Sequence, residues 1–468
     1  MNTKITTTKL LILYFGVRLF SFLFSPVTPL QAQHPINTLV SFLILALTAY
    51  LILKKDERGW YIVAIEILLG GSGGYLKLGF ISLRTALLLI STSIFFIQKF
   101  ISEKINFLKR FRIDRAFIIT LIFAAGLSAL RGFYMNHARS AIFADFIPYL
   151  FLLYYFPLRE LLQSAGFREL CKNTIITAIF GNALLILFTQ VGLSSGLFVL
   201  QDSYYHWYRD VALGKITDLN SGYFRLVLNE HLLLIPLTLY FIGDIIKNSV
   251  SKINISILFS LLFILTNNLT RIYILALALG ILILFSTTKW KRWLIVSVSA
   301  TIAFILIFVA SHTLATRGQS FGLELFGLRL QSIASPQIEN SSMSRMLLLP
   351  KILDKIKLHP ILGNGLGDNI SVYSPIFKTT ITTPNFDWGY LEIWAETGLL
   401  GIITWLAFIL TVFYNIIKNS YQYNKNILLA ILSGLLVLNV TSPALFHVFG
   451  IILLIILLAS VETKHDLT

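Results

Sequence analysis

The feature that most constrains this chain is its succession of apolar stretches. A helix crosses a bilayer with about 20 mostly apolar residues, and by that measure we find about fourteen candidate spans (twelve to fourteen). They are 9–25, 36–53, 60–78, 80–98, 116–131, 140–157, 173–199, 224–244, 253–269, 271–287, 293–312, 389–417, 426–442 and 444–460. A backbone without water must satisfy its own polar groups, so these stretches predict an all-α polytopic membrane protein.

Composition agrees with this fold class. Of 468 residues, 56% are hydrophobic and only 13% are charged, whereas soluble domains are about 25% charged. The formal charge of +16 fits the basic cytoplasmic loops of a membrane protein, so we do not expect nucleic acid as a partner. Cys171 is the single cysteine, which excludes an intramolecular disulfide.

Lysine and arginine predict the orientation. Six basic segments fall on one side if the N-terminus is cytoplasmic: 54–58, 99–115, 158–172, 247–252, 289–292 and 418–425. Both termini are then cytoplasmic and the long polar interval 312–388 is periplasmic. We read the apolar N-terminus as a retained first span, because Arg18 interrupts it and no clean cleavage site follows. The expected organisation is a helix bundle over 1–311, the loop over 312–388, and the last helices with a short tail over 389–468.

The predicted outer side is poor in lysine but carries many arginines. They are Arg84, Arg131, Arg139, Arg209, Arg225, Arg271, Arg317, Arg329 and Arg345. The planar guanidinium suits phosphate, and an ionised group near a span boundary is costly unless it faces the bundle interior or water. The set therefore indicates an anionic ligand, although each arginine taken alone is also explained by contact with lipid headgroups.

The loop has its own pattern. Met346, Leu349, Leu353 and Ile356 recur at helical spacing, which predicts an amphipathic helix on the membrane near 346–358, started or bent by Pro350. After His359-Pro360, three glycines follow at alternate positions, Gly363, Gly365 and Gly367. They suit either a simple turn or a nest of amides that binds an anion.

Carboxylates lead from this loop into the next span. Asp387 stands at the expected helix start, where it is either a cap or a reactive carboxylate, and Tyr390 and Trp394 follow on the same face. Glu392 and Glu396 lie deeper, where structural pairing is the expected role.

Two further clusters project to the predicted outer side. Arg225, Glu230 and His231 open one span, and Asn267, Asn268, Thr270 and Arg271 mark the end of another. His231 is either a hydrogen-bonded core histidine or a catalyst. No histidine pair has ligand spacing, so no metal and no other cofactor is expected.

The order of these pieces resembles the O-antigen ligase and O-antigen polymerase superfamily. The matching residues are Arg345, then HPILGNGLG (359–367), then DWGYLEIWAETGLLG (387–401), with Thr270-Arg271 and Ser82-Leu83-Arg84 in support. The family's proteins are bacterial inner-membrane enzymes with many spans and one large periplasmic loop late in the chain. The resemblance implies an inverting, metal-independent glycosyltransferase of the integral-membrane GT-C class, whose donor is an oligosaccharide on undecaprenyl pyrophosphate.

The resemblance also suggests roles for individual residues. Ligases of the family carry a histidine, proposed to activate the acceptor, where this chain has Asp387. Asp387 is thus the first candidate for the base, with Glu230 and His231 as others. Arg225, Arg271 and Arg345 are candidates for binding pyrophosphate, with Arg84 a weaker fourth, and Tyr390, His359 and the three glycines are expected to line the site.

The predicted function is a polymerase that joins a growing glycan to the next lipid-linked repeat unit, with a chain-length-regulating co-polymerase as a possible partner. A ligase that transfers polymer to lipid A core shares fold and donor, as does a protein-glycosylating relative. A transporter of lipid-linked sugars is a fourth reading, but transporters usually show related halves, and we see no internal repeat.

Overall fold

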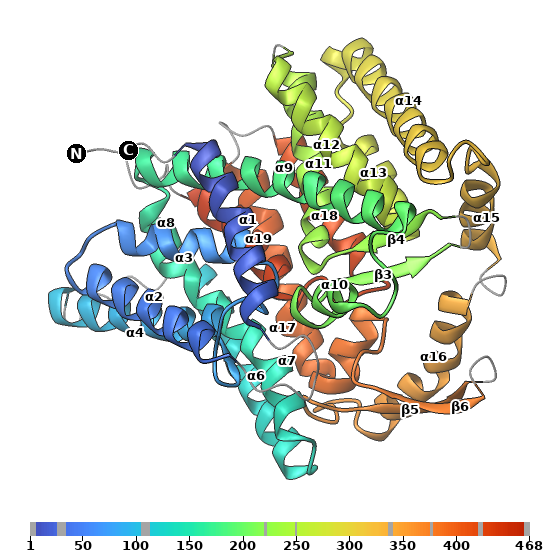
Figure 1. The fold of residues 1–468 in the computed structure, drawn as a ribbon. Helices are drawn as coiled ribbons and strands as arrows, with labels where there is room; N and C mark the ends of the chain where they lie inside the picture. The colour runs from blue at the N-terminus through green and yellow to red at the C-terminus, as the bar shows by residue number, and fades with distance from the viewer. Residues whose placement is uncertain are drawn as a thin grey trace. The chain divides into compact units, whose positions relative to one another are not determined.

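The protein is described from a computed structural model, which places residues 6–25, 34–103, 113–219, 222–248, 250–335, 340–374, 378–419 and 425–462. These residues are mostly helical (Figure 1). The predicted positions of both chain ends, and most of the basic segments 99–115 and 418–425, lie outside the described residues.

Within the described residues the helices are α1 (Thr7–Phe24), α2 (Pro35–Leu53), α3 (Arg58–Leu69), α4 (Leu83–Glu103), α6 (Ile113–Tyr134), α7 (Arg139–Leu150), η1 (Phe151–Tyr154), α8 (Tyr155–Leu161), α9 (Ala165–Ser195), α10 (Ser203–His206), η2 (Trp207–Val211), η3 (Asn229–Leu233), α11 (Leu234–Lys247), α12 (Lys252–Asn268), α13 (Arg271–Ile283), η4 (Thr287–Lys289), α14 (Trp290–Ala315), α15 (Leu323–Ala334), α16 (Asn340–Leu358), α17 (Gly389–Asn419), α18 (Lys425–Leu438) and α19 (Val448–Glu462). Three antiparallel hairpins join them: β1 (Lys77–Leu78) with β2 (Ile81–Ser82), β3 (Lys215–Asp218) with β4 (Phe224–Val227), and β5 (Ile370–Ser374) with β6 (Thr379–Thr383).

The prediction of an all-α polytopic membrane protein is confirmed. Among the described residues, 9 helices are long and apolar enough to cross a membrane, and four shorter apolar helices accompany them. The count of about fourteen is therefore not confirmed. One difference is the predicted span 60–78, because α3 ends at Leu69 and the chain turns through Gly71 and Gly73, both at positive φ.

The predicted span 224–244 begins later than expected. Its first residues form β4, and the apolar helix of this region runs Asn229–Lys247. Arg225 therefore lies on a strand and is not in the opening turn of a helix. The hairpin pairs Arg225 with Thr217, opposite it on β3.

The chain forms two compact units, and neither is continuous in sequence. Unit 1 comprises Met1–Ser102, Glu160–Thr270 and Phe285–Glu324, and unit 2 comprises Glu103–Arg159, Arg271–Leu284 and Leu325–Thr468. The linear division into bundle, loop and last helices stays a prediction about membrane topology.

In unit 1, the long helix α9 is the common neighbour of α1, α3 and α12. The Ser164 hydroxyl accepts from the Phe167 amide and caps its first turn, and Gly196 ends it in the left-handed conformation with φ 83°. Helix α12 also packs on α11 and α14. This arrangement holds the end of α12 beside β4.

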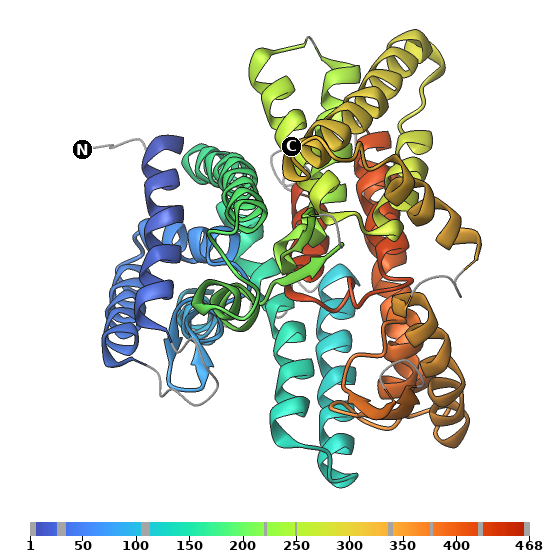
Figure 2. The same cartoon turned by 45° about the vertical axis from the view of Figure 1, so that its right-hand side comes forward.

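In unit 2, helix α17 contacts α6, α16, α18 and α19. Figure 2 shows its neighbour α6 lying alongside α7. Helix α17 is broken at Gly398, whose φ of 69° and ψ of −170° are not helical. Its first half, Gly389 to Thr397, is therefore a separate helical segment that does not continue regularly into the second half.

The polar interval 312–388 is largely structured. It holds α15, α16 and the β5–β6 hairpin, and α16 packs on both β5 and α17. The helix predicted near 346–358 exists as part of α16, which includes Pro350. Its buried face, however, is formed by Leu348, Ile352 and Ile356, while Met346 and Leu353 are exposed.

Candidate functional site

A tight turn in unit 2 presents Asp387. Its φ of 57° lies in the left-handed region, which aspartate tolerates better than most residues. Phe386 before it is fully buried against Leu348, Ile352 and Ile356 of α16. The Phe386 amide donates to Glu392 Oε2 at 3.2 Å, which closes the turn onto the start of α17. Glu392 thus holds the turn through a hydrogen bond to the backbone, and the pairing expected for it stays a prediction.

Helix α16 meets this turn through Arg345. The Arg345 Nε lies 3.8 Å from Asp387 Oδ2, and their side chains are 24% and 45% exposed. The Trp388 indole donates to the Arg345 carbonyl at 3.1 Å. Asp387 therefore lies between the buried Phe386 and Trp388, whose indole is hydrogen-bonded to α16. Its carboxylate faces the Arg345 guanidinium, which is partly exposed to solvent.

Arg271 joins the same part of unit 2. It is the first residue of α13, and its Nη2 donates to the hydroxyl of Ser342. Ser342 precedes Arg345 by three residues on α16, which places the two side chains on one face of that helix. Arg271, Arg345 and Asp387 come from separate stretches of the sequence, and the fold gathers them around α16. We call these three residues the α16 site.

The amides of the glycine string are used within the protein. Its amides are all donated within the protein, to His359 O, Ala395 O, Glu396 O, Ser128 O and the Asp145 carboxylate. Gly363, Gly365 and Gly367 all have positive φ, and a Cβ on Gly363 would lie 2.3 Å from Glu396 O. Because these amide hydrogens already have acceptors, the contacts favour the turn reading over an anion nest. The expected place of the three glycines in the site stays a prediction.

The loop 359–367 supplies hydrogen-bond partners for the backbone at the break in α17. The Leu399 amide donates to Pro360 O at 2.9 Å, and the Gly365 amide donates to Glu396 O at 2.9 Å. A Cβ on Gly398 would lie 2.2 Å from Ile361 O. The loop and the kinked helix therefore exchange the backbone hydrogen bonds that a regular helix would make internally.

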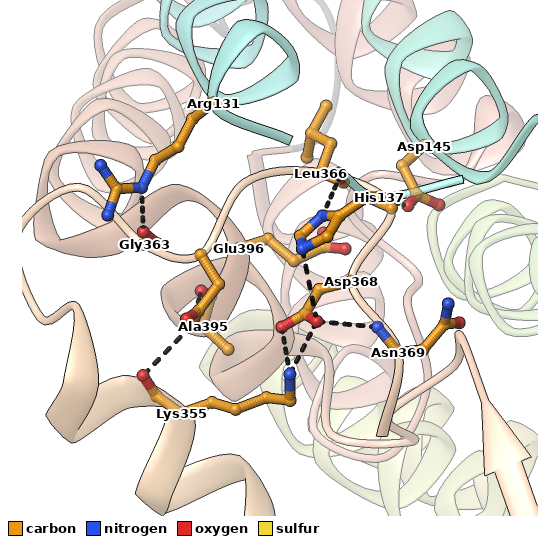
Figure 3. Close-up of polar contacts among 12 residues, drawn as sticks. Arg131, His137, Asp145, Lys355, Gly363, Leu366, Asp368, Asn369, Ala395 and Glu396 are labelled. Carbon is orange, nitrogen blue, oxygen red and sulfur yellow. Dashed lines mark hydrogen bonds and ion pairs between the residues drawn. The ribbon is translucent and has the colours of Figure 1, made fainter. Parts of the chain in front are cut away.

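A polar cluster around the buried Asp368 fixes the loop to α6, to the turn that follows α6 and to α16 (Figure 3). Arg131 Nε donates to Gly363 O. The Asp368 carboxylate lies 2.6 Å from Lys355 Nζ and 3.7 Å from His137 Nε2, and His137 Nδ1 lies 2.9 Å from Leu366 O. Sequence reasoning missed this cluster, because Arg131 and His137 precede their partners by more than 200 residues.

Two other predicted lining residues have structural contacts. The Tyr390 hydroxyl donates to Leu436 O of α18 at 2.8 Å. The His359 carbonyl accepts from the Gly363 amide at 2.9 Å and closes the turn after α16. Their expected place in the site stays a prediction.

Unit 1 holds the other predicted residues. Arg225 on β4 reaches the end of α12, where its Nε donates to Asn268 O at 2.8 Å and its Nη2 donates to Thr270 Oγ1 at 2.9 Å. Its side chain is half-buried. Asn268 and Thr270 were noted in the sequence only as polar residues at a span end.

Glu230 and His231 are both buried. Glu230 pairs with Arg18 of α1 at 3.2 Å, with side chains only 7% and 4% exposed. His231 Nδ1 accepts from the Leu228 amide at 3.2 Å and faces Asn268 Nδ2 at 3.0 Å. The sequence offered one sign of the first pair, a lone arginine in an apolar run.

Arg84 is buried in a similar pair. Its Nε donates to Glu66 Oε2 at 3.1 Å, and its Nη2 donates to the carbonyls of Glu66, Ile67 and Gly71. It ties α4 to the turn that ends α3. Its weaker candidacy for pyrophosphate stays a prediction beside this structural role.

Within the described residues, no group of three or more histidine, cysteine, aspartate or glutamate side chains is arranged to hold a metal ion. The metal independence implied by the resemblance stays a prediction.

The chain was compared with known proteins. Residues 255–406 match the family model Wzy_C, described as O-antigen ligase. A search of curated proteins returns no match to this chain. The matched segment includes Arg271, Arg345, Asp387 and the glycine loop, and it leaves out Arg225, Glu230 and His231.

Family and fold point the same way. Members of this family are glycosyltransferase-like membrane enzymes that act on lipid-linked oligosaccharides, and this chain is a multi-pass membrane protein. The match supports placing the chain in the O-antigen ligase and polymerase superfamily, and it does not distinguish the polymerase branch from the ligase branch.

Proposed function

We propose that this protein polymerises lipid-linked glycan repeat units in the bacterial inner membrane. The donor is the growing glycan on undecaprenyl pyrophosphate, and the acceptor is a repeat unit on a second such carrier. The observation that carries the proposal is the α16 site, where the partly exposed carboxylate of Asp387 and the two arginines Arg271 and Arg345 lie around one helix.

The reaction is a displacement at the anomeric carbon. A sugar hydroxyl of the acceptor attacks that carbon while Asp387 takes the hydroxyl proton. The new O–C bond forms as the bond from carbon to the pyrophosphate oxygen breaks, and undecaprenyl pyrophosphate leaves with the electron pair. Attack from the opposite face inverts the anomeric configuration.

The arginines serve the leaving group. Arg271 and Arg345 stabilise the charge that develops on the departing pyrophosphate, because guanidinium groups bind phosphate oxygens in pairs. The 3.8 Å separation between Arg345 and Asp387 is long for a hydrogen-bonded pair. We expect Arg345 to turn to the pyrophosphate when donor binds, which leaves the Asp387 carboxylate a better base.

Asp387 suits the role of base better than the other two candidates. Its side chain is 45% exposed, whereas Glu230 is buried and paired with Arg18. His231 Nδ1 already accepts from a backbone amide. A base has to reach the substrate hydroxyl, and exposure favours Asp387.

The polymerase branch is favoured by one residue. Ligases that this chain resembles carry histidine where it has Asp387, so the acceptor side of the site differs from theirs. A ligase remains the second candidate, because the matching family model is described as O-antigen ligase. A co-polymerase that sets chain length would be a partner of the polymerase only.

The test is a reconstitution in liposomes. Purified protein receives a lipid-linked repeat unit and no other acceptor, and the products are separated by size. A ladder of multiples supports the polymerase. Transfer that appears only after lipid A core is added supports the ligase. Movement of lipid-linked sugar across the bilayer without any new glycosidic bond overturns both.

Variants connect the activity to the site. Arg271→Ala and Arg345→Ala should each abolish the ladder while the protein still accumulates in the membrane. Arg209→Ala is the matched control, since Arg209 is an exposed arginine that pairs with the adjacent Asp210. Long products from either site variant would remove that arginine from the mechanism.

A further inference from the structure

Two carboxyl groups of unit 2 meet behind the glycine loop. Asp145 belongs to α7, and Glu396 lies on α17 two residues before the break at Gly398. Their side chains are hydrogen-bonded to each other, and Figure 3 shows Glu396 extending toward Asp145. Asp145 is partly buried, whereas Glu396 is only 3% exposed. Because carboxylate oxygens can only accept, a hydrogen bond between these two groups needs a proton on one of them.

The protein supplies a hydrogen-bond donor to one of the two groups. The Gly367 amide donates to Asp145 Oδ2 at 2.9 Å. Glu396 Oε1 is buried and has no hydrogen-bond partner among the described residues. Donors stabilise an ionised carboxylate, whereas a neutral carboxyl group donates through its own O–H. The contacts therefore favour the negative charge on Asp145 and the proton on Glu396.

Within the part of the chain that the structure describes, no ion pair includes either carboxyl group. The titratable and charged groups around the pair are Arg131, His137, Tyr149, Lys355, Asp368 and Glu392. Lys355 binds Asp368 at 2.6 Å, and Arg131 donates to the loop backbone. His137 attracts Asp145 only when its ring is protonated. Two ionised carboxylates at this place would therefore repel each other without a paired cation to offset their charge.

Both members of the pair are also joined to the glycine loop. Asp145 accepts from the Gly367 amide through its side chain, and Glu396 accepts from the Gly365 amide through its backbone carbonyl, at 2.9 Å. The loop is thereby fixed to the first segment of α17, which begins two residues after Asp387. A change in the separation of the two carboxyl groups would disturb both contacts to the loop.

We propose that Asp145 and Glu396 share a single proton, and that this pair is a protonation-dependent lock which holds the glycine loop on α17 and so positions Asp387. Glu396 is then a positioning residue, because it acts on the reaction through the loop and not by contact with substrate. The link to Asp387 rests on the proposed function, whereas the proton and the lock do not. Loss of the proton places two negative charges side by side and loosens the loop.

Replacements of Glu396 separate a shared proton from simple packing. In Glu396→Gln the side-chain amide donates to Asp145 at every pH, as the protonated carboxyl group does. In Glu396→Leu the hydrogen bond is lost and an apolar side chain fills the space. Asp354→Asn is the matched control, because it removes an exposed carboxyl group of α16. A Glu396→Gln protein that fails to fold while Asp354→Asn folds overturns the proposal, since glutamine reproduces the proposed hydrogen bond.

The first measurement is the unfolding equilibrium constant of the purified full-length protein in detergent micelles. It is made between about pH 5 and pH 8, above the range in which carboxyl groups of an unfolded chain titrate. A folded chain that holds one extra proton releases it on unfolding, so stability falls and this constant rises about tenfold per pH unit from that proton.

Glu396→Gln and Glu396→Leu should both lower this slope by about one proton, and Glu396→Gln should be the more stable of the two. Asp354→Asn should keep the slope of the unaltered protein. An unchanged slope in Glu396→Gln overturns the shared proton.

The second measurement is hydrogen exchange of the peptide that carries the loop 359–367, compared between chains at the same pH. At a pH where the pair has lost its proton, the unaltered protein should exchange faster than Glu396→Gln. At a pH where the proton is held, the two should exchange alike. Equal exchange at every pH contradicts the lock, and with it the proposal.

Polymerisation on liposomes then tests the link to Asp387. In Glu396→Gln the alkaline limb of the activity profile against pH should move to higher pH, while the acidic limb set by the base stays in place. An active Glu396→Gln with an unmoved alkaline limb contradicts the positioning of Asp387. If no chain joins lipid-linked repeat units, the proposed function fails, and the unfolding and exchange results still decide the proton and the lock.

Discussion

Asp387 combines three properties. Its backbone is left-handed, its side chain is exposed, and a guanidinium lies beside it. Residues held in sparsely populated backbone regions cluster at functional sites, because surrounding structure has to hold them there. The buried Phe386 and the Phe386–Glu392 hydrogen bond supply that support.

Asp387→Asn tests the base directly. Asparagine tolerates the left-handed backbone as well as aspartate does, so folding should be preserved. Loss of a general base should lower the polymerisation rate about 100-fold or more. The rate is measured on liposomes with lipid-linked repeat unit, and thermal unfolding serves as the control. A rate within a few-fold of the unaltered protein would leave Asp387 a helix cap only.

Glu230 tests the opposite case, a buried carboxylate with a structural partner. Glu230→Gln leaves Arg18 as an unpaired charge that is 4% exposed, and breaking a buried pair costs about 3–5 kcal/mol. We expect Glu230→Gln to accumulate poorly in the membrane. The double variant Arg18→Met, Glu230→Gln should restore accumulation, because no buried charge remains.

The double variant also separates structure from chemistry. If it folds and polymerises, Glu230 is not the base. If the double variant folds but is inactive, while Arg18→Met alone is active, Glu230 becomes a candidate base again.

At the scale of elements, the broken helix α17 organises unit 2. A regular helix through Gly398 would leave no place for the loop 359–367, whose carbonyls and amides fill the break. The kink also frees the first half of α17, which begins two residues after Asp387, to point toward α16. The glycine string and the sequence Glu396-Thr397-Gly398 are therefore two halves of one structural joint.

Gly398→Ala should damage this joint. Gly398 has φ 69° and ψ −170°, a combination that essentially only glycine adopts and that costs other residues about 1–3 kcal/mol, and the Cβ of alanine would meet Ile361 O at 2.2 Å. We expect a clear fall in the unfolding temperature and loss of activity. Gly126→Ala is the matched control, since a Cβ there meets nothing within 4 Å. A stable, active Gly398→Ala would show that the joint tolerates a regular helix.

At the scale of the whole molecule, the orientation in the membrane is open to test. The distribution of lysine predicts a cytoplasmic segment at 158–172 and a periplasmic loop at 312–388. Gln163 and Thr380 are exposed residues in these two regions. Each is replaced by cysteine in a chain whose Cys171 has been changed to serine.

A membrane-impermeant thiol reagent added to intact cells should label Thr380→Cys and spare Gln163→Cys. After the cells are opened, both should react, which controls for access. The reverse pattern in intact cells would invert the topology and move the α16 site to the cytoplasmic face. Such a result would contradict a reaction on the periplasmic side.

The sequence by itself determined the class of molecule. Apolar runs long enough to span a bilayer, and the poverty of charge, leave only a helical membrane bundle. The order of Arg345, the glycine string and Asp387 was sufficient to suggest the superfamily, since those residues are close along the chain. These conclusions depend on local pattern, which can be read without knowing how distant segments pack.

The tertiary structure decided which polar residues meet. Arg271 reaches Ser342, Glu230 pairs with Arg18, and Arg131 holds Gly363, all across long separations in sequence. It also showed that the amides of the three glycines donate within the protein, to two backbone carbonyls and to the Asp145 carboxylate. A buried donor or acceptor has to find a partner wherever the fold provides one, and that partner is set by packing between helices, on which local sequence is silent.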